Sequence, residues 1–186
     1  TVMLSAAPVG HGGTAVSSGI LSLTGEDSFA CLVDKIGADR ALDAITLMEE
    51  AIGNIEKLCS EFAGQEIPGG DCGFRRMDCL RYTENEQLEG RIRQEYSLQL
   101  HNGFVAELLS PITASSQFTF PMAAGVYTKG AAGQVDPYRL VHAVTALAKQ
   151  RGARIYENSA VTAMRPETAE GEYSLMELDC STGRRV

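Results

Sequence analysis

The chain has 186 residues, of which 44% are hydrophobic and 22% charged, so it can bury the core of one large domain or two small ones. Its 16 basic and 24 acidic residues give a net charge of −8, which argues against nucleic-acid or anionic-membrane binding, because both need clustered lysine and arginine. No run of residues is long and apolar enough for a membrane span and no secretory signal opens the chain, so we expect a cytoplasmic protein.

The cysteines fit a reducing compartment. Their number is odd and no Cys-x-x-Cys pair occurs, so the sequence predicts reduced, mostly buried thiols, with neither a disulfide framework nor a metal site. They are Cys31, Cys59, Cys72, Cys79 and Cys180.

The first expected strand, residues 1–4, leads into a loop at 10–19 that is rich in glycine, threonine and serine. Such a loop lets the backbone approach a ligand closely and offers N–H groups and hydroxyls to an anion. Two interpretations stay open, a phosphate or cofactor-edge loop and a flexible surface loop. Two interpretations of His11 also stay open, a catalytic base and a solvated loop histidine.

Two helices are expected next. Residues 24–27 can cap a short helix over 28–36 that Gly37 ends. A second helix over 39–62 has the clearest helical period in the chain, with one apolar stripe. The stripe consists of Leu42, Ile45, Met48, Ile52, Ile55, Cys59 and Phe62.

The middle of the chain alternates strands and loops around one helix. We expect a strand over 74–82, a capping box at 83–86 that begins a helix to about 101, and a short strand over 105–109. Residues 64–73 and 111–116 are expected to be loops.

The last third begins with an expected strand over 118–127. Asp136 followed by Pro137 then predicts a helix start, and Gly152 predicts the helix end. With a strand over 153–156, this pattern predicts a right-handed strand–helix–strand crossover unit of an α/β fold.

Both ends resemble the interior of a protein. Residues 173–180 are strand-like, 181–183 resemble a turn, and 184–186 would start a returning strand that is not completed. We therefore expect an internal fragment whose activity is not intact, and we expect self-association through the sheet edges that truncation leaves exposed.

The order of these segments resembles the FAD-dependent oxidoreductases of the D-amino acid oxidase type, which include glycine oxidase-like and glycerol-3-phosphate dehydrogenase-like enzymes. The resemblance covers nearly the whole chain and depends on order and spacing rather than on one motif. The segments that carry it are 10–19, 38–62, 71–76, 80–83, 133–137 with Leu140, and 152–158 with Val161.

The resemblance implies a mixed α/β (α+β) fold, in which a partial FAD-binding Rossmann-like domain carries an inserted antiparallel substrate-domain sheet. Residues 1–72 would be the first part of the FAD-binding region. Residues 73–133 would form the substrate-domain strands and helix, and residues 134–186 would return to the FAD-binding region.

The function that the resemblance implies is oxidation of an amine, amino acid or hydroxy acid, a small-molecule substrate, by hydride transfer to FAD. Carried over by position, Gly12, Gly13, Thr14, Ser17 and Ser18 would lie along the flavin and pyrophosphate, and the backbone of Val161 would hold the adenine. A strand over 118–129 would face the flavin, with Tyr127 and Lys129 as substrate-side candidates. Both side chains also have an ordinary interpretation as amphipathic strand residues.

Two departures from the family pattern matter. The Gly-x-Gly-x-x-Gly turn that binds the pyrophosphate does not occur in the chain, and Ser5 stands where an acidic residue normally binds the ribose. They favour an alternative, a non-catalytic binding or interaction module that keeps the substrate-domain fold. A nicotinamide-dependent dehydrogenase is disfavoured because no second glycine fingerprint appears.

Overall fold

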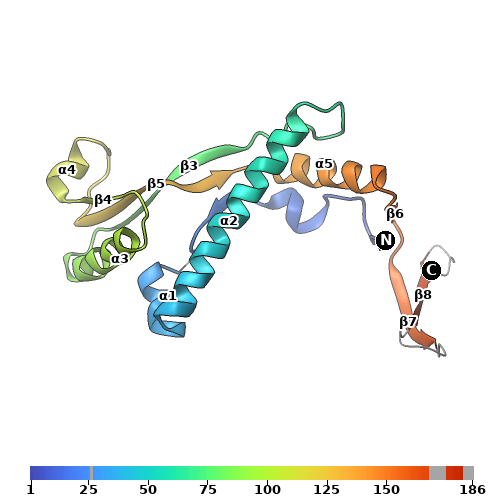
Figure 1. Ribbon diagram of the computed structural model, residues 1–186, viewed down its shortest axis with the longest axis horizontal. Helices are drawn as coiled ribbons and strands as arrows, with labels where there is room; N and C mark the ends of the chain where they lie inside the picture. Colours follow the sequence, from blue (N-terminus) through green and yellow to red (C-terminus); the bar gives the residue numbers. More distant parts are fainter. Residues whose placement is uncertain (26, 168–174, 182–186) are drawn as a thin grey trace. The chain divides into compact units, whose positions relative to one another are not determined.

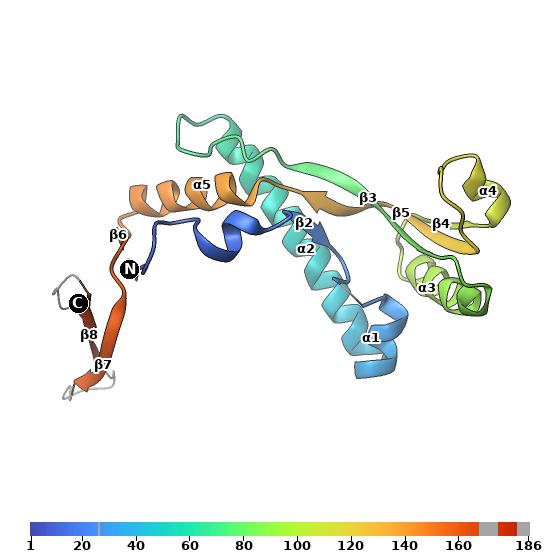
Figure 2. The same cartoon turned by 180° about the vertical axis from the view of Figure 1, so that it is seen from behind.

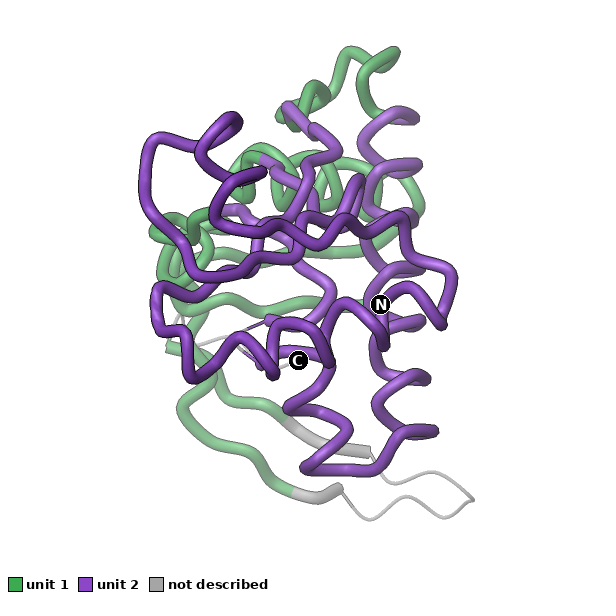
Figure 3. Tube along the Cα trace, turned by 90° about the vertical axis from the view of Figure 1, so that its left-hand side faces the viewer, with its two compact units in different colours: residues 1–18, 62–72, 136–186 green, residues 19–61, 73–135 purple. Residues whose placement is uncertain are grey.

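A computed structural model describes residues 1–25, 27–167 and 175–181 of the chain. The chain divides into two compact units, drawn in green and purple in Figure 3. Unit 1 comprises residues 1–18, 62–72 and 136–186, and unit 2 comprises residues 19–61 and 73–135. Residues 19–61, which the sequence groups with the first part of the FAD-binding region, therefore belong to the same compact unit as the expected substrate-domain strands.

Unit 1 contains a pair of parallel strands, β1 (Val2–Leu4) and β6 (Arg154–Tyr156). Their register places Leu4 opposite Tyr156, although the two strands are far apart in the sequence. Figures 1 and 2 show β6 beside the N-terminal strand. Rossmann-like sheets are built from parallel strands paired in this way. The predicted strand at 153–156 is confirmed as β6.

The helix of unit 1, α5 (Pro137–Gln150), has the ends that the sequence predicts. The Asp136 side chain accepts a hydrogen bond from the backbone N–H of Arg139 at 3.0 Å, and Pro137 occupies the first helical position. Gly152 has a φ of +88°, the left-handed conformation of a helix-ending glycine.

A second strand pair in unit 1, β7 (Val161–Glu167) and β8 (Leu175–Cys180), is antiparallel. The strand expected over 173–180 is thus confirmed from Leu175 onward. Residues 173 and 174, and the returning strand expected at 184–186, lie outside the described residues.

Unit 2 is built on an antiparallel sheet centred on β5 (Ala124–Gln134). Three strands pair with β5, each antiparallel to it: β2 (Ile20–Ser22), β3 (Arg75–Thr83) and β4 (Ala106–Leu109). The mixed α/β fold with a parallel pair and an inserted antiparallel sheet is therefore confirmed.

Helices α1 (Phe29–Ile36), α2 (Ala38–Ala63) and α3 (Glu89–His101) accompany this sheet. Helix α2 contributes Ile45 of the predicted apolar stripe, and also Ala41, to a core cluster around Phe29. A second cluster joins Ile92 of α3 to Ala124 and Val126 of β5. Of the apolar stripe predicted over 39–62, Ile45, Ile52, Cys59 and Phe62 are buried, whereas Met48 is 44% exposed. The helical period thus predicted most of the buried face of α2.

The crossover unit predicted around α5 is wrong. The strand before α5 is β5 of the antiparallel sheet, and the strand after it is β6, which pairs with β1 in a different sheet. The helix therefore connects two sheets rather than two strands of one sheet. The strand expected over 118–127 also begins later, at Ala124, because residues 118–123 form turns and irregular backbone that include Pro121.

Two further local predictions need correction. Residues 111–115 form the short helix α4 (Pro111–Ser115), capped reciprocally by Ser110 and Thr113, instead of a loop. The capping box expected at 83–86 does not form, because Thr83 is the last residue of β3 and its hydroxyl accepts from the N–H of Asn85. Asn85 instead caps the turn η2 (Glu86–Leu88) that precedes α3.

Candidate functional site

The carboxyl ends of β1 and β6 form one edge of unit 1. The parallel pairing continues past both strands, because the Ser5 N–H donates to the Tyr156 carbonyl at 2.9 Å and the Ser159 N–H donates to the Ser5 carbonyl at 2.7 Å. Ligands of parallel α/β sheets bind outside this edge of the strands. The glycine-rich loop at 10–19 follows the carboxyl end of β1 after residues 5–9, and all but its last residue belongs to unit 1.

The loop has one anchored part and one open part. Gly10 has a φ of +84°, and a Cβ there would lie 3.0 Å from the ring of Tyr138 on α5, so glycine is needed for this close approach. Gly12, Gly13 and Thr14 lie in a short 3-10 helix, η1 (Gly12–Val16). A Cβ built on either Gly12 or Gly13 would meet no atom within 4 Å. The open part therefore has room for a group such as a cofactor edge.

The other residues expected along the cofactor also belong to unit 1, and Ser17 and Ser18 lie within this loop. Ser17 ends η1, where its N–H donates to the Thr14 carbonyl at 3.3 Å, and Ser18 is exposed beside it. Val161 begins β7 opposite Cys180 and is 43% exposed. His11 is exposed, with its ring 6.5 Å from that of Tyr138.

Tyr127 and Lys129 lie on β5 of unit 2, two residues apart and hence on one face of the strand. The Tyr127 hydroxyl donates to Asp78, and the second oxygen of that carboxylate accepts from the Gly130 N–H at 2.8 Å. Asp78 stands where the register between β3 and β5 shifts, between Met77 and Cys79. This irregularity brings an acidic side chain to the tyrosine.

The pairing changes the acidity of both groups. The hydrogen bond from Tyr127 holds the pKa of Asp78 below its ordinary value, with further contributions from the Gly130 N–H and the nearby Lys129 charge. The same hydrogen bond, followed by desolvation, raises the pKa of Tyr127 above its ordinary value. Near neutral pH the pair is a neutral phenol donating to a carboxylate.

A chain of aromatic rings lies next to this pair. Phe118 contacts Tyr127 at 6.3 Å between ring centroids and Phe120 at 5.5 Å, and Phe120 contacts Tyr82 at 4.9 Å. Residues 118–123 thus contribute aromatic side chains to the surroundings of Tyr127 without being part of the strand. An apolar surface beside polar groups that can orient a ligand is typical of small-molecule sites.

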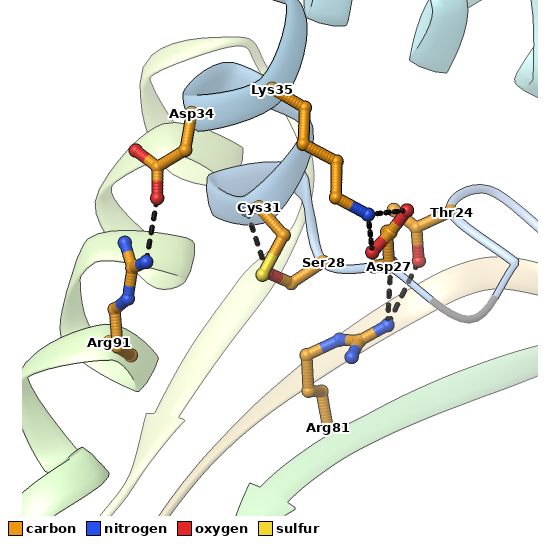
Figure 4. A network of polar contacts seen from close by, with 8 residues as sticks. All are labelled: Thr24, Asp27, Ser28, Cys31, Asp34, Lys35, Arg81 and Arg91. Carbon is orange, nitrogen blue, oxygen red and sulfur yellow. Dashed lines mark hydrogen bonds and ion pairs between the residues drawn. The ribbon is translucent and has the colours of Figure 1, made fainter.

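A separate polar network holds α1 in unit 2 (Figure 4). The Arg81 guanidinium donates to the Thr24 hydroxyl and to the Asp27 carbonyl, each at 3.0 Å, and the Lys35 ammonium donates to the Asp27 carboxylate at 2.7 Å. Each of these polar groups has a protein partner, so we assign the network to the fold rather than to chemistry.

Sequence reasoning missed two carboxylates at these surfaces. They are Asp78, which accepts from the Tyr127 hydroxyl, and Glu157, which accepts from the Val9 N–H in the segment after β1. Polar and apolar residues alternate poorly over the expected strand at 74–82, and this was the available signal for Asp78, because a charged residue within a strand suggests an irregularity. Among the residues that the structure describes, no group of three or more His, Cys, Asp or Glu side chains is arranged to hold a metal ion. Nor does the described part of the chain contain a helix long and apolar enough to cross a membrane.

The parallel strand pair, the glycine loop at its carboxyl edge and the antiparallel sheet define a protein of the cofactor-binding α/β class. The family model described as FAD dependent oxidoreductase matches residues 1–184, and the chain belongs to this family. The cofactor of the family is FAD. A search of curated proteins finds no match.

Solved structures share the fold at low sequence identity. Glycine oxidase from Geobacillus kaustophilus has a TM-score of 0.74 and 19% identity, over 98% of this chain and 45% of that one. Glycine oxidase from Bacillus cereus ATCC 14579 has a TM-score of 0.71 and 18% identity, over 98% of this chain and 46% of that one. L-alpha-glycerophosphate oxidase from Mycoplasma pneumoniae with FAD bound has a TM-score of 0.63 and 15% identity, over 97% of this chain and 43% of that one. The chain thus spans just under half the length of these proteins.

Proposed function

We propose that this chain is part of an FAD-dependent oxidoreductase that oxidises an amine, amino acid or hydroxy acid by hydride transfer to the flavin. The observation that carries the proposal is the open pair Gly12 and Gly13 at the carboxyl edge of β1, in a chain of an FAD-dependent family. The matched structures include glycine oxidases and a glycerophosphate oxidase, and this range supports the substrate class without selecting one member.

The loop fits the cofactor for a physical reason. Gly12 has a φ of +88°, so its neighbouring N–H groups can turn outward, and Gly13 adds no side chain between the backbone and an approaching group. Thr14, Ser17 and Ser18 add hydroxyls, and the backbone of Val161 is our candidate for the adenine contact. Bound FAD would supply the hydride acceptor for the carbon that bears the amine or hydroxyl.

Tyr127, Asp78 and Lys129 are our candidates for the substrate side. The Tyr127 proton is committed to Asp78, so the phenolic oxygen retains its lone pairs as acceptors for a substrate ammonium or hydroxyl. The Lys129 side chain is exposed and positive, and it can attract a substrate carboxylate. The three residues therefore orient a substrate rather than carry out the redox step.

Flavin retention tests the proposal directly. The purified chain is mixed with FAD, the excess is removed, and the visible absorbance of the protein fraction is measured. We expect a retained flavin spectrum that bleaches without oxygen when a suitable amine, amino acid or hydroxy acid is added. A folded protein that retains no flavin would contradict a cofactor role for the loop and favour the non-catalytic module.

A matched pair of glycine variants distinguishes a cofactor role of the loop from the general effect of placing leucine at an exposed glycine. Gly13 and Gly64 are both exposed, both belong to unit 1, neither has a positive φ, and a Cβ at either meets no atom within 4 Å. We expect Gly13→Leu to weaken FAD binding at least tenfold while the melting temperature stays unchanged. Gly64→Leu should leave both unchanged, and equal FAD affinity of the two variants would overturn the assignment.

A further inference from the structure

A carboxylate, Glu157, stands beside Ser5, the residue that this chain has where the family pattern has an acidic side chain. Glu157 follows β6 directly and lies next to Ser5 across the parallel pair, since Leu4 is opposite Tyr156. The Ser5 N–H donates to the Tyr156 carbonyl, and the Ser5 carbonyl accepts from the Ser159 N–H. Ser5 is therefore bonded to the backbone on both sides of Glu157. The carboxyl edge of the two strands therefore does carry an acidic side chain, on the neighbouring strand.

The local backbone fixes the direction of Glu157. Asn158 has a φ of +51°, the left-handed conformation that asparagine tolerates better than most residues, and it turns the chain immediately after the glutamate. The Ser159 hydroxyl then donates to the Glu157 carbonyl at 3.0 Å. One carboxylate oxygen of Glu157 accepts from the Val9 N–H at 2.6 Å, across 148 residues of sequence. The side chain is thus held over the start of the glycine loop.

One of the two carboxylate oxygens of Glu157 remains available to accept a hydrogen bond from a ligand. The residue is exposed, and within the described ranges its second oxygen has no hydrogen-bond partner or ion pair. Ser5 offers much less, because its hydroxyl proton is already donated to the Ala7 carbonyl at 2.6 Å. A serine oxygen in this state is one neutral acceptor, whereas the carboxylate is a charged one.

We propose that Glu157 is the ribose-binding carboxylate of this chain and accepts hydrogen bonds from the ribose hydroxyls of the adenosine half of FAD. The inference rests on the proposed cofactor role of the glycine loop. In dinucleotide folds the ribose hydroxyls are bound by an acidic side chain at the carboxyl edge of the sheet, and Glu157 is at that edge. The segment that follows it leads to Val161, our candidate for the adenine contact.

The test uses adenosine 5′-monophosphate and its 2′,3′-dideoxy analogue as probes, titrated into the purified chain by calorimetry. The wild type should bind the ribose form roughly tenfold more tightly, because a hydrogen bond to a charged group is made only with the hydroxyls present. In Glu157→Gln this preference should fall to about twofold or less. The amide oxygen can still accept from the Val9 N–H, so the melting temperature should not change.

The ratio of the two affinities distinguishes ribose binding from a structural role of Glu157. If Glu157 only held the loop after β1, the substitution would weaken both probes equally or neither, and that result would overturn the inference. The same variant is then titrated with FAD, where we expect affinity to fall roughly tenfold. Unchanged FAD affinity in Glu157→Gln, combined with weakened binding in Gly13→Leu, would reject the role of Glu157 while leaving the proposed function in place.

Discussion

The Glu95 carboxylate accepts a hydrogen bond from the backbone N–H of Ala30 at 2.8 Å, although 65 residues separate the two. Ala30 lies in the first turn of α1, where N–H groups have no partner within the helix, and Glu95 on α3 is only 1% exposed. Its other oxygen accepts from Gln99, which in turn accepts from the buried Thr128 hydroxyl at 2.6 Å. This chain of bonds joins α1, α3 and β5.

Removing the carboxylate should destabilise unit 2. Glu95→Ala leaves the Ala30 N–H without an acceptor and enlarges a cavity of about 30 Å³ that Glu95 already lines. We expect the free energy of unfolding to fall by about 3 kcal/mol. Denaturant unfolding measures the loss, and hydrogen exchange at Ala30 should accelerate with it.

The control for this prediction is Glu95→Gln. The amide keeps one oxygen for the Ala30 N–H, so we expect a smaller loss of about 1 kcal/mol. If glutamine is as damaging as alanine, the negative charge at the helix N-terminus, rather than the hydrogen bond, stabilises α1.

Local signals in the sequence predicted the features that depend on neighbouring residues. The period over 39–62 predicted α2 and most of its buried face, and the Asp136-Pro137 pair predicted the start of α5. The glycine loop was recognised because an open backbone turn has a compositional signature. The short helix α4 was missed because its cap pairs Ser110 with Thr113 rather than with Glu or Gln.

Contacts between distant segments were not accessible in the same way. The bond between Glu157 and Val9 depends on the parallel register of β1 and β6, and the pairing of Asp78 with Tyr127 depends on a register shift. The first contact changes neither the period nor the composition of its own segment, and the only trace of the second is the weak polar alternation over 74–82. The predicted crossover around α5 failed for a related reason, since a strand–helix–strand pattern does not specify whether both strands belong to one sheet.

Gly69 should be irreplaceable in the loop that packs on α5. A Cβ there would lie 2.2 Å from the Arg139 carbonyl oxygen and 3.1 Å from the Ala143 nitrogen, and its φ is +78°. Gly69→Ala therefore combines a steric clash with an unfavourable backbone, and we expect a loss of about 3 kcal/mol in thermal or denaturant unfolding. Gly64→Ala, at an open position of the same unit, should change stability little. A tolerated Gly69→Ala would show that the loop does not pack this closely on the helix.

Two substitutions of Asp136 distinguish its contribution as the N-cap of α5 from its contribution through the ion pair with Arg139. Asp136 caps the helix through the Arg139 N–H and also lies 3.4 Å from the Arg139 side chain, with both side chains substantially exposed. We expect Asp136→Ala to cost about 1 kcal/mol, and Asp136→Asn, which keeps a cap acceptor but no charge, to cost much less. Equal losses in the two variants would assign the effect to the ion pair instead.

The Asp78–Tyr127 pair should make stability depend on pH in two opposite directions. The pKa of Asp78 is lowered by folding, so its contribution is present above the ordinary carboxyl value and is lost as the pH falls through the folded pKa. The pKa of Tyr127 is raised, so its contribution is fully present below the ordinary phenol value and is lost as the pH rises through the folded pKa. Denaturation midpoints of the wild type and Tyr127→Phe should therefore differ most between about pH 5 and pH 9 and converge in acid and in strong base. A difference that stays constant down to low pH would mean that the loss of the hydroxyl acts otherwise than through its hydrogen bond to the ionised Asp78 carboxylate, since phenylalanine keeps the ring and its contact with Phe118.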